Sequence, residues 1–202
     1  MNLYLKIGLE IFKVKIIGVT NRKLCDDFYG RIAEISKMDL EYLILREKDL
    51  SHDELKIMAN EIKDILGDSS VKLIINGNIN VAKDVEAVGV QLPFRHFSEG
   101  IAKDYDGVVG VSIHSLREAI DGEALGASYL LYGHVFETDC KKGVTPRGLV
   151  ELREICSRVK IPVYAIGGIN EKNYKDVLDS GAYGVAVMSS LMTKSVVNDK
   201  IV

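Results

Sequence analysis

The sequence predicts a (β/α)8 barrel, in which eight parallel strands alternate with helical segments. Eight short runs rich in Val, Ile and Leu recur along the chain, and stretches between them carry apolar residues at helical spacing. This alternation fits into 202 residues, at the lower end of the usual size of such barrels. A doubly wound open sheet is the alternative that the periodicity leaves open.

The expected strands are continuous apolar runs, a pattern typical of strands buried on both faces of a parallel sheet. No Pro-, Gly- or Ser-rich linker divides them, so we expect residues 1–202 to form one barrel domain. Residues 1–13 precede the first run, and we expect an N-terminal extension there, either an extra strand or a loose arm. In chain order the expected strands span residues 14–19, 42–45, 71–75, 89–92, 108–112, 129–132, 162–166 and 184–187.

Three amphipathic stretches support the helical half of the pattern. Ser51 and Glu54 form a capping-box pattern, and apolar residues keep helical spacing from 55 to 66. Residues 149–159 show the same spacing, as do residues 174–178 before a glycine at 181. We therefore expect helices to begin near these three positions.

Composition excludes several classes of function. The chain has 26 Lys and Arg against 29 Asp and Glu, a net charge of −3, so we expect no nucleic-acid partner. No apolar run reaches the roughly 20 residues needed to span a bilayer, and the first residues lack a signal-peptide pattern, so we expect a cytoplasmic protein without a membrane partner. Three cysteines without a CxxC pair indicate neither a disulfide framework nor a zinc site, and we expect no metal or other cofactor.

Polar and glycine-rich segments follow the apolar runs, and the active site of a barrel lies at these carboxyl ends of the strands. After the seventh run, Gly167 and Gly168 allow the backbone to approach a ligand closely. After the eighth run, Ser189 and Ser190 begin a short helix and present N–H groups and hydroxyls to an anion. The two pairs together predict a phosphate site, and the alternative is that the glycines only form a tight turn.

Other strand ends carry groups for proton transfer and anion binding. His134 is a candidate acid–base group near neutral pH, and a structural hydrogen-bonding role is the alternative. Arg46 and Lys48 alternate after the second run and face one side of an extended segment, where they bind an anion unless they belong to an ordinary solvated run. Lys141 follows Thr138 in a loop long enough to act as a flap.

Four segments carry a resemblance to a known family. They are GHVFETDCKKG at 133–143, VSIHSL at 111–116, AIGGI at 165–169 and AVMS at 186–189. From about residue 15 to 191 the chain resembles the thiamine-phosphate synthase/TenI superfamily, and the first segment is most similar to its thiazole tautomerase branch. The resemblance implies a (β/α)8 barrel and a function in thiamine biosynthesis.

The tautomerase resemblance implies an isomerase that converts an exocyclic carboxythiazole phosphate to its aromatic isomer by proton transfer without a metal. It assigns the acid–base role to His134. The resemblance assigns binding of the phosphate to the backbone of Gly167 and Gly168 and to Ser189 and Ser190. Further binding residues that the resemblance carries over are Arg46, Lys48, Asn76, Ser112, Thr138 and Lys141.

Departures from the synthase pattern favour this branch. A synthase displaces pyrophosphate with the help of Mg²⁺, and its family places aspartates after the third and fourth strands. Here those segments read Asn76-Gly77-Asn78 and Gln91-Leu92-Pro93, Ile44 replaces a glutamine, and Cys140 replaces a threonine. The alternatives are a divergent magnesium-dependent synthase and a non-catalytic protein that binds thiazole or thiamine phosphate. The expected partner is a small thiazole phosphate. The resemblance also implies that two copies of the chain form a homodimer.

Overall fold

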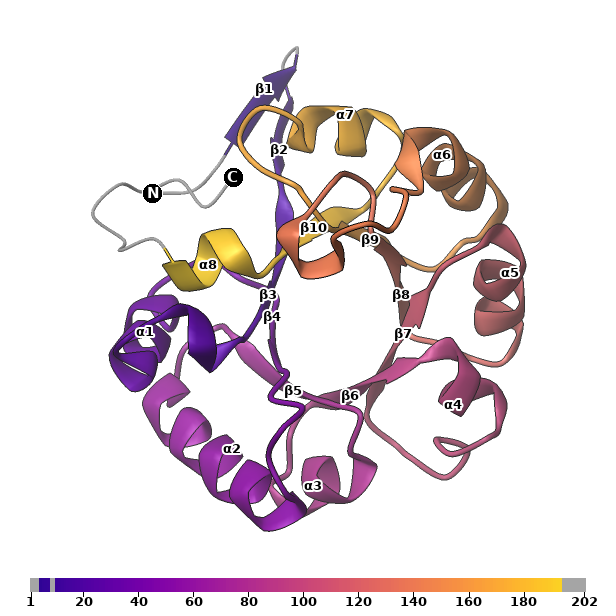
Figure 1. The fold of residues 1–202 in the computed structure, drawn as a ribbon. Coiled ribbons are helices and arrows are strands. Elements are labelled where there is room, and N and C mark those ends of the chain that lie inside the picture. Colours follow the sequence, from indigo (N-terminus) through magenta and orange to yellow (C-terminus); the bar gives the residue numbers. More distant parts are fainter. Residues whose placement is uncertain (1–3, 8–9, 194–202) are drawn as a thin grey trace.

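The strands of this computed structural model, which describes residues 4–7 and 10–193, close into a barrel (Figure 1). Eight parallel strands follow one another around the ring in the order β10-β3-β4-β5-β6-β7-β8-β9. Closure comes from β10, which pairs with β3 from Gly184↔Lys15 to Val187↔Gly18. The predicted (β/α)8 barrel is confirmed, and the open sheet is excluded. The strands are β3 (Lys15–Val19), β4 (Tyr42–Leu45), β5 (Lys72–Asn76), β6 (Gly89–Pro93), β7 (Val108–Ile113), β8 (Tyr129–Gly133), β9 (Val163–Ile166) and β10 (Gly184–Val187).

Helices surround the barrel on its outer face (Figure 1). The capping box predicted for α2 is present: the Ser51 hydroxyl accepts the Glu54 amide at 3.4 Å, and the Glu54 carboxylate accepts the Ser51 amide at 2.8 Å. The helices predicted near 149–159 and 174–178 are also present. The helical segments are η1 (Arg22–Leu24), α1 (Phe28–Ile35), α2 (His52–Leu66), α3 (Ile79–Asp84), α4 (Phe94–Ser98), α5 (Leu116–Ala124), η2 (Asp139–Lys141), α6 (Gly148–Arg158), α7 (Tyr174–Asp179) and α8 (Ser189–Thr193).

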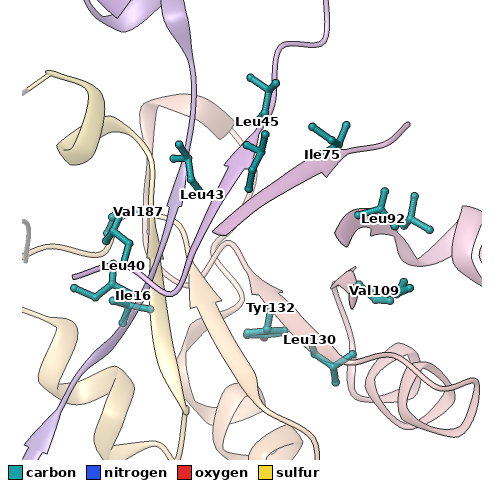
Figure 2. Close-up of a cluster of buried hydrophobic side chains, with 14 of the residues drawn as sticks. Ile16, Leu40, Leu43, Leu45, Ile75, Leu92, Val109, Leu130, Tyr132 and Val187 are labelled. Atoms are coloured by element: carbon teal, nitrogen blue, oxygen red, sulfur yellow. The ribbon is translucent and has the colours of Figure 1, made fainter. Parts of the chain in front are cut away.

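Side-chain alternation along each strand divides the apolar residues into two clusters. In β4, Leu43 and Leu45 belong to the larger cluster between strands and helices, part of which Figure 2 shows. Ile44, between them, belongs to a smaller cluster that includes Ile17 and Ile74 from the neighbouring strands. Because strand side chains alternate between faces, the smaller cluster fills the barrel interior. The apolar runs are continuous because both faces are buried.

The interior changes from aromatic to polar along the barrel axis. At the amino ends of the strands, Tyr129 stacks on Tyr42 at a centroid distance of 5.6 Å and meets Tyr164 edge-on at 5.5 Å. Two residues beyond inward-facing Ile44 and Ile74, the same alternation places Arg46 and Asn76 at the carboxyl ends. The amino end is therefore plugged by aromatic rings, and the carboxyl end is the polar mouth.

The expected N-terminal extension includes a two-stranded sheet that is separate from the barrel sheet. β1 (Tyr4–Ile7) pairs with β2 (Glu10–Lys13) in antiparallel register, from Tyr4↔Lys13 to Ile7↔Glu10. This hairpin extends outward from the ring of strands (Figure 1). Residues 1–3 and 8–9 of the expected extension lie outside the described residues. Over the described ranges, no helix is both long and apolar enough to traverse a lipid bilayer.

Candidate active site

Three cations converge at the barrel mouth. Arg46 and Lys48 follow β4, and Lys141 ends η2 in the loop after β8. The pKa of Lys48 is lowered, first by repulsion from Arg46, then by desolvation, and then by Lys141. Lys141 thus acts on Lys48 from a segment far away in the chain, because the loops after β4 and β8 both lie at the carboxyl end of the barrel. Such a cluster is suited to a multiply charged anion.

A buried carboxylate holds the segment that carries two of these cations. Glu47 is only 3 % exposed at its side chain, and it accepts hydrogen bonds from the Thr20 hydroxyl at 2.8 Å and the Arg22 amide at 2.9 Å. The Thr20 oxygen in turn accepts the Arg46 amide at 2.9 Å. Glu47 points toward the β3 loop, and Lys48 directly after it begins a turn in which the Leu50 amide donates to the Glu47 carbonyl at 3.4 Å. This role of Glu47 was not predicted from the sequence, although an acidic residue between two basic ones is the signal for it.

Arg22 completes the clamp between the loops after β3 and β4. Its guanidinium donates to Glu47 at 3.0 Å and forms two bonds of 2.8 Å to Asp49. Lys23 also pairs with Asp49 at 2.9 Å. The Arg22 hydrogen bonds hold the pKa of the Asp49 carboxyl well below its ordinary value, with a smaller contribution from Lys23. Both carboxylates near the cation cluster are therefore engaged by positive groups.

The loop between β8 and α6, residues 134–147, forms a flap that is fixed at its base. His134 is 4 % exposed, and its Nε2 lies 3.1 Å from the carbonyl oxygen of Val144. The Arg147 amide donates to the His134 carbonyl at 3.0 Å, and the Gly148 amide donates to Val135 at 3.2 Å. His134 Nδ1 is buried and lacks a hydrogen-bond partner among the described residues. His134 thus lies within the flap base, bridging its two ends.

Gly167 and Gly168 lie directly beneath this flap. Their φ angles are +103° and +67°, in the region that favours glycine. A Cβ on Gly167 would lie 2.3 Å from the His134 Cβ, and one on Gly168 would lie 2.3 Å from the Glu137 carbonyl oxygen. The Phe136 amide donates to the Gly167 carbonyl at 3.0 Å. Close approach of the flap therefore explains why this pair lacks side chains.

The flap also reaches the first turn of α8. Cys140 Sγ lies 3.8 Å from Ser189 Oγ, so the tip of the flap lies beside the predicted phosphate serines Ser189 and Ser190. Thr138 precedes η2, and its carbonyl accepts the Lys141 amide at 3.0 Å. The flap brings Thr138, Lys141 and the α8 residues to one side of the mouth.

Asn76 is the last residue of β5, and Ser112 lies near the end of β7, further around the ring. Ser112 is half-buried at the end of β7, and its hydroxyl accepts a hydrogen bond of 2.9 Å from the Gln91 amide. Gln91 is 1 % exposed, and besides donating to Ser112 it accepts a hydrogen bond of 2.6 Å from the Tyr129 hydroxyl. The hydrogen bonds of Gln91 to Ser112 and Tyr129 were not predicted from the sequence, although a polar residue within an apolar run is a signal for a buried hydrogen bond.

His114 lies at the rim between β7 and β8. Its Nδ1 is 2.6 Å from the Gly133 carbonyl, and its amide donates to Glu118 at 2.6 Å. Desolvation lowers the pKa of His114, which the Gly133 hydrogen bond partly opposes. The neutral form donates its proton to Gly133, so His114 orients the rim between the two strands.

The mouth does not fit a divalent cation, which would need oxygen ligands with negative charge. The Asn78 side-chain oxygen accepts the Val81 amide at 3.0 Å and caps α3, and Gln91 is engaged by Ser112 and Tyr129. Among residues 4–7 and 10–193, no group of three or more His, Cys, Asp and Glu side chains is placed to hold a metal. The donor set here favours anions.

Comparison with known proteins identifies what the chain is similar to. The family model described as thiamine monophosphate synthase matches residues 16–191. The thiamine-phosphate synthase of Clostridium acetobutylicum is 36 % identical over 193 residues, covering 92 % of this chain and 90 % of that protein. The thiamine-phosphate synthase of Pyrococcus horikoshii is 36 % identical, covering 89 % and 87 %. The putative thiamine-phosphate synthase 2 of Aquifex aeolicus is 34 % identical, covering 88 % and 97 %.

Solved structures agree with the sequence comparison. Thiamine phosphate pyrophosphorylase from Pyrococcus furiosus superposes with a TM-score of 0.80 at 31 % identity, covering 93 % of this chain and 92 % of that one. An N-acetylmannosamine-6-phosphate 2-epimerase from Clostridium perfringens superposes with a TM-score of 0.62 at 20 % identity, covering 89 % and 87 %, and shares the fold.

These relatives correct the function and enzyme class expected from sequence. The expectation of an isomerase of the thiazole tautomerase branch is wrong, because relatives at 34–36 % identity are named thiamine-phosphate synthases, which are transferases. That expectation depended on the flap segment and on His134 as a proton carrier. In the structure the Nε2 of His134 faces the Val144 carbonyl inside the flap base. The findings favour the alternative, a divergent synthase.

Proposed function

Because the chain belongs to the thiamine monophosphate synthase family, we propose that it is a divergent thiamine-phosphate synthase. In this reaction a pyrimidine is transferred from its pyrophosphate ester to a thiazole phosphate. The bond from the pyrimidine's methylene carbon to oxygen breaks, the thiazole nitrogen bonds to that carbon, and pyrophosphate leaves. Negative charge develops on the leaving group, so catalysis needs positive groups placed to receive it.

The observation that carries the proposal is the placement of Arg46 and Lys48 directly after β4 at the carboxyl end of the barrel, where Lys141 of the flap also acts on Lys48. We assign them to the pyrophosphate, since a guanidinium and two ammonium groups stabilise negative charge as it develops. Glu47 supports this assignment because its hydrogen bonds fix the segment that carries two of the three cations. No step in this scheme passes through a metal.

The thiazole phosphate is assigned to the part of the mouth that follows β9 and β10. Gly167, Gly168, Ser189 and Ser190 would hold its phosphate, with Thr138 in the flap above them. Support comes from their proximity: the flap contacts both glycines, and its Cys140 lies beside Ser189. Asn76 ends β5 and Ser112 lies near the end of β7, and both would contact the rings. His134 would hold the flap base in place.

The test is formation of thiamine phosphate from the two substrates, measured by chromatography with fluorescence detection after oxidation. We expect product with the wild type, and a loss of about 100-fold in kcat/KM for Lys141→Met. Lys37→Met, at an exposed site following α1, serves as the control and should keep full activity. The assay is run with Mg²⁺ and with EDTA. Absence of product under both conditions would contradict the synthase proposal.

One observation favours a second candidate function. The segments Asn76-Gly77-Asn78 and Gln91-Leu92-Pro93 lack the carboxylates expected of a synthase that uses a metal. A protein that binds thiazole or thiamine phosphate without turnover needs the anion sites but no leaving-group chemistry. Calorimetry distinguishes the two: tight binding of thiamine phosphate without product formation would support a ligand-binding regulator.

A further inference from the structure

A chain of three polar side chains crosses the barrel interior and ends at the mouth. The Tyr129 hydroxyl in β8 donates to Gln91 Oε1 in β6 at 2.6 Å, and Gln91 Nε2 donates to Ser112 Oγ in β7 at 2.9 Å. Gly110 leaves room for the contact, because a Cβ there would lie 2.2 Å from Gln91 Oε1 and 2.2 Å from the Tyr129 ring. The three hydrogen-bonded side chains therefore occupy space that the missing side chain at position 110 leaves open.

The two distances fix the orientation of the Gln91 amide. A separation of 2.6 Å is typical of an O–H···O bond, whereas 2.9 Å is typical of N–H···O. Burial raises the pKa of Tyr129, with smaller contributions from Tyr42 and Glu41, so this hydroxyl keeps its proton. The amide oxygen consequently faces Tyr129, and the amide nitrogen faces Ser112.

This orientation determines what Ser112 offers to a ligand. Its oxygen accepts the proton of the amide, so its own hydroxyl proton is left to point toward the mouth. We propose that Gln91 is a positioning residue that holds Ser112 as a hydrogen-bond donor to the substrate. Without the amide, the Ser112 hydroxyl rotates among several orientations and loses part of its donor geometry.

The position of Ser112 indicates which part of the substrate it contacts, and this step rests on the proposed function. β7 lies three strands away from β10 around the ring, so Ser112 is separated from the assigned phosphate residues after β9 and β10. A ligand held there by its phosphate extends its ring system across the mouth. The acceptor for Ser112 is therefore a nitrogen or oxygen atom on the heteroaromatic end of the ligand, remote from the phosphate.

A double-mutant cycle tests the inference. Dissociation constants for thiamine phosphate are measured by calorimetry for the wild type, Gln91→Met, Ser112→Ala and the double variant, and kcat and KM are measured separately. Met resembles Gln in length and flexibility but cannot donate a hydrogen bond. We expect each single variant to weaken binding about 3- to 10-fold. The double variant should bind no more weakly than Ser112→Ala, because Gln91 acts through Ser112.

Tyr164→Phe is the matched control, because it also removes a hydrogen bond from an inward-facing residue, at the amino end of the barrel. It should leave the dissociation constant unchanged. Additive effects of Gln91→Met and Ser112→Ala, with Tyr164→Phe unchanged, would overturn the positioning role and leave the synthase proposal intact. Equal weakening in all three single variants would indicate a general packing effect and would also overturn it. Failure of the wild type to bind thiamine phosphate would overturn both proposals.

Discussion

Arg46 and Lys48 illustrate how a local sequence pattern becomes an electrostatic site. The expected extended segment ends in a turn at Lys48, and Glu47 between the two cations is bonded to the neighbouring loop. Two like charges are thereby held together at a cost that is visible in the lowered pKa of Lys48. An anion that binds both groups removes this repulsion, so the unliganded site is poised for negative charge.

The coupling between the two cations can be measured directly. Replacing Arg46 with Met removes the largest cause of the lowered Lys48 pKa, so the midpoint of Lys48 titration should rise. In the wild type, Lys48 therefore loses its charge at a lower pH than in the variant. Carbon NMR of labelled lysine side chains checks this, with Lys48→Arg identifying the signal. An unchanged midpoint in Arg46→Met would show that the two groups are farther apart than the structure places them.

The buried carboxylate should contribute to stability as well as to position. Glu47→Gln removes the charge that accepts bonds from Thr20 and Arg22, and we expect a loss of about 2 kcal/mol in the free energy of unfolding. Urea denaturation measures the loss. Glu99→Gln is the control, since its pairing with Arg95 is largely exposed and should contribute little. Equal effects of the two variants would contradict the assigned role of Glu47.

At the scale of elements, the flap is the segment that links the two proposed anion sites. Its base is bonded through His134 and Arg147, and its tip carries Lys141, which lowers the pKa of Lys48, and Cys140, which lies beside Ser189. Gly167 and Gly168 allow the flap to lie against the β9 loop. Positioning of the flap and binding of the ligands are therefore coupled.

Gly168→Ala tests this coupling. The variant meets both an unfavourable φ of +67° and a contact of 2.3 Å with the Glu137 carbonyl. Gly100→Ala is the control, because φ there is +79° but nothing lies within 4 Å of the added methyl. We expect the control to lose about 1 kcal/mol in the free energy of unfolding, and Gly168→Ala to lose about 2–4 kcal/mol and to bind thiamine phosphate more weakly. Equal losses in both variants, with unchanged affinity, would contradict a role for the close packing.

Sequence patterns predicted the elements more completely than the site. All eight barrel strands and the capped start of α2 were predictable. Continuous apolar runs and the Ser51–Glu54 spacing involve only residues that are close together in the chain. The clamp made by Thr20 and Glu47 was not, since the two residues are 27 positions apart and meet only when β3 and β4 pair. The branch of the family was also misjudged, because one similar loop outweighed the identity spread over the whole chain.

At the scale of the whole molecule, the two ends of the barrel carry different groups. The amino end contains packed tyrosines, with the Tyr164 hydroxyl donating to Glu41 at 2.8 Å. The carboxyl end carries the cations, the flap and Ser112. Exposed side chains at the mouth, such as Lys48 and Lys141, bury little apolar surface. Substituting them should therefore change ligand binding more than the free energy of unfolding.

This difference predicts opposite effects for removing a buried hydrogen bond at the amino end and for removing an exposed charge at the mouth. Tyr164→Phe removes one buried hydrogen bond and should lower the free energy of unfolding by about 1 kcal/mol, with thiamine phosphate affinity unchanged. Lys141→Met removes an exposed charge and should leave the free energy of unfolding unchanged while weakening the binding of inorganic pyrophosphate about 10-fold or more. Urea denaturation and calorimetry on the same preparations measure both quantities. At saturating ligand, the stabilisation of each variant should follow its own dissociation constant, because only the folded protein binds. A variant at the amino end that lost affinity in proportion to stability would show that the two ends are not independent.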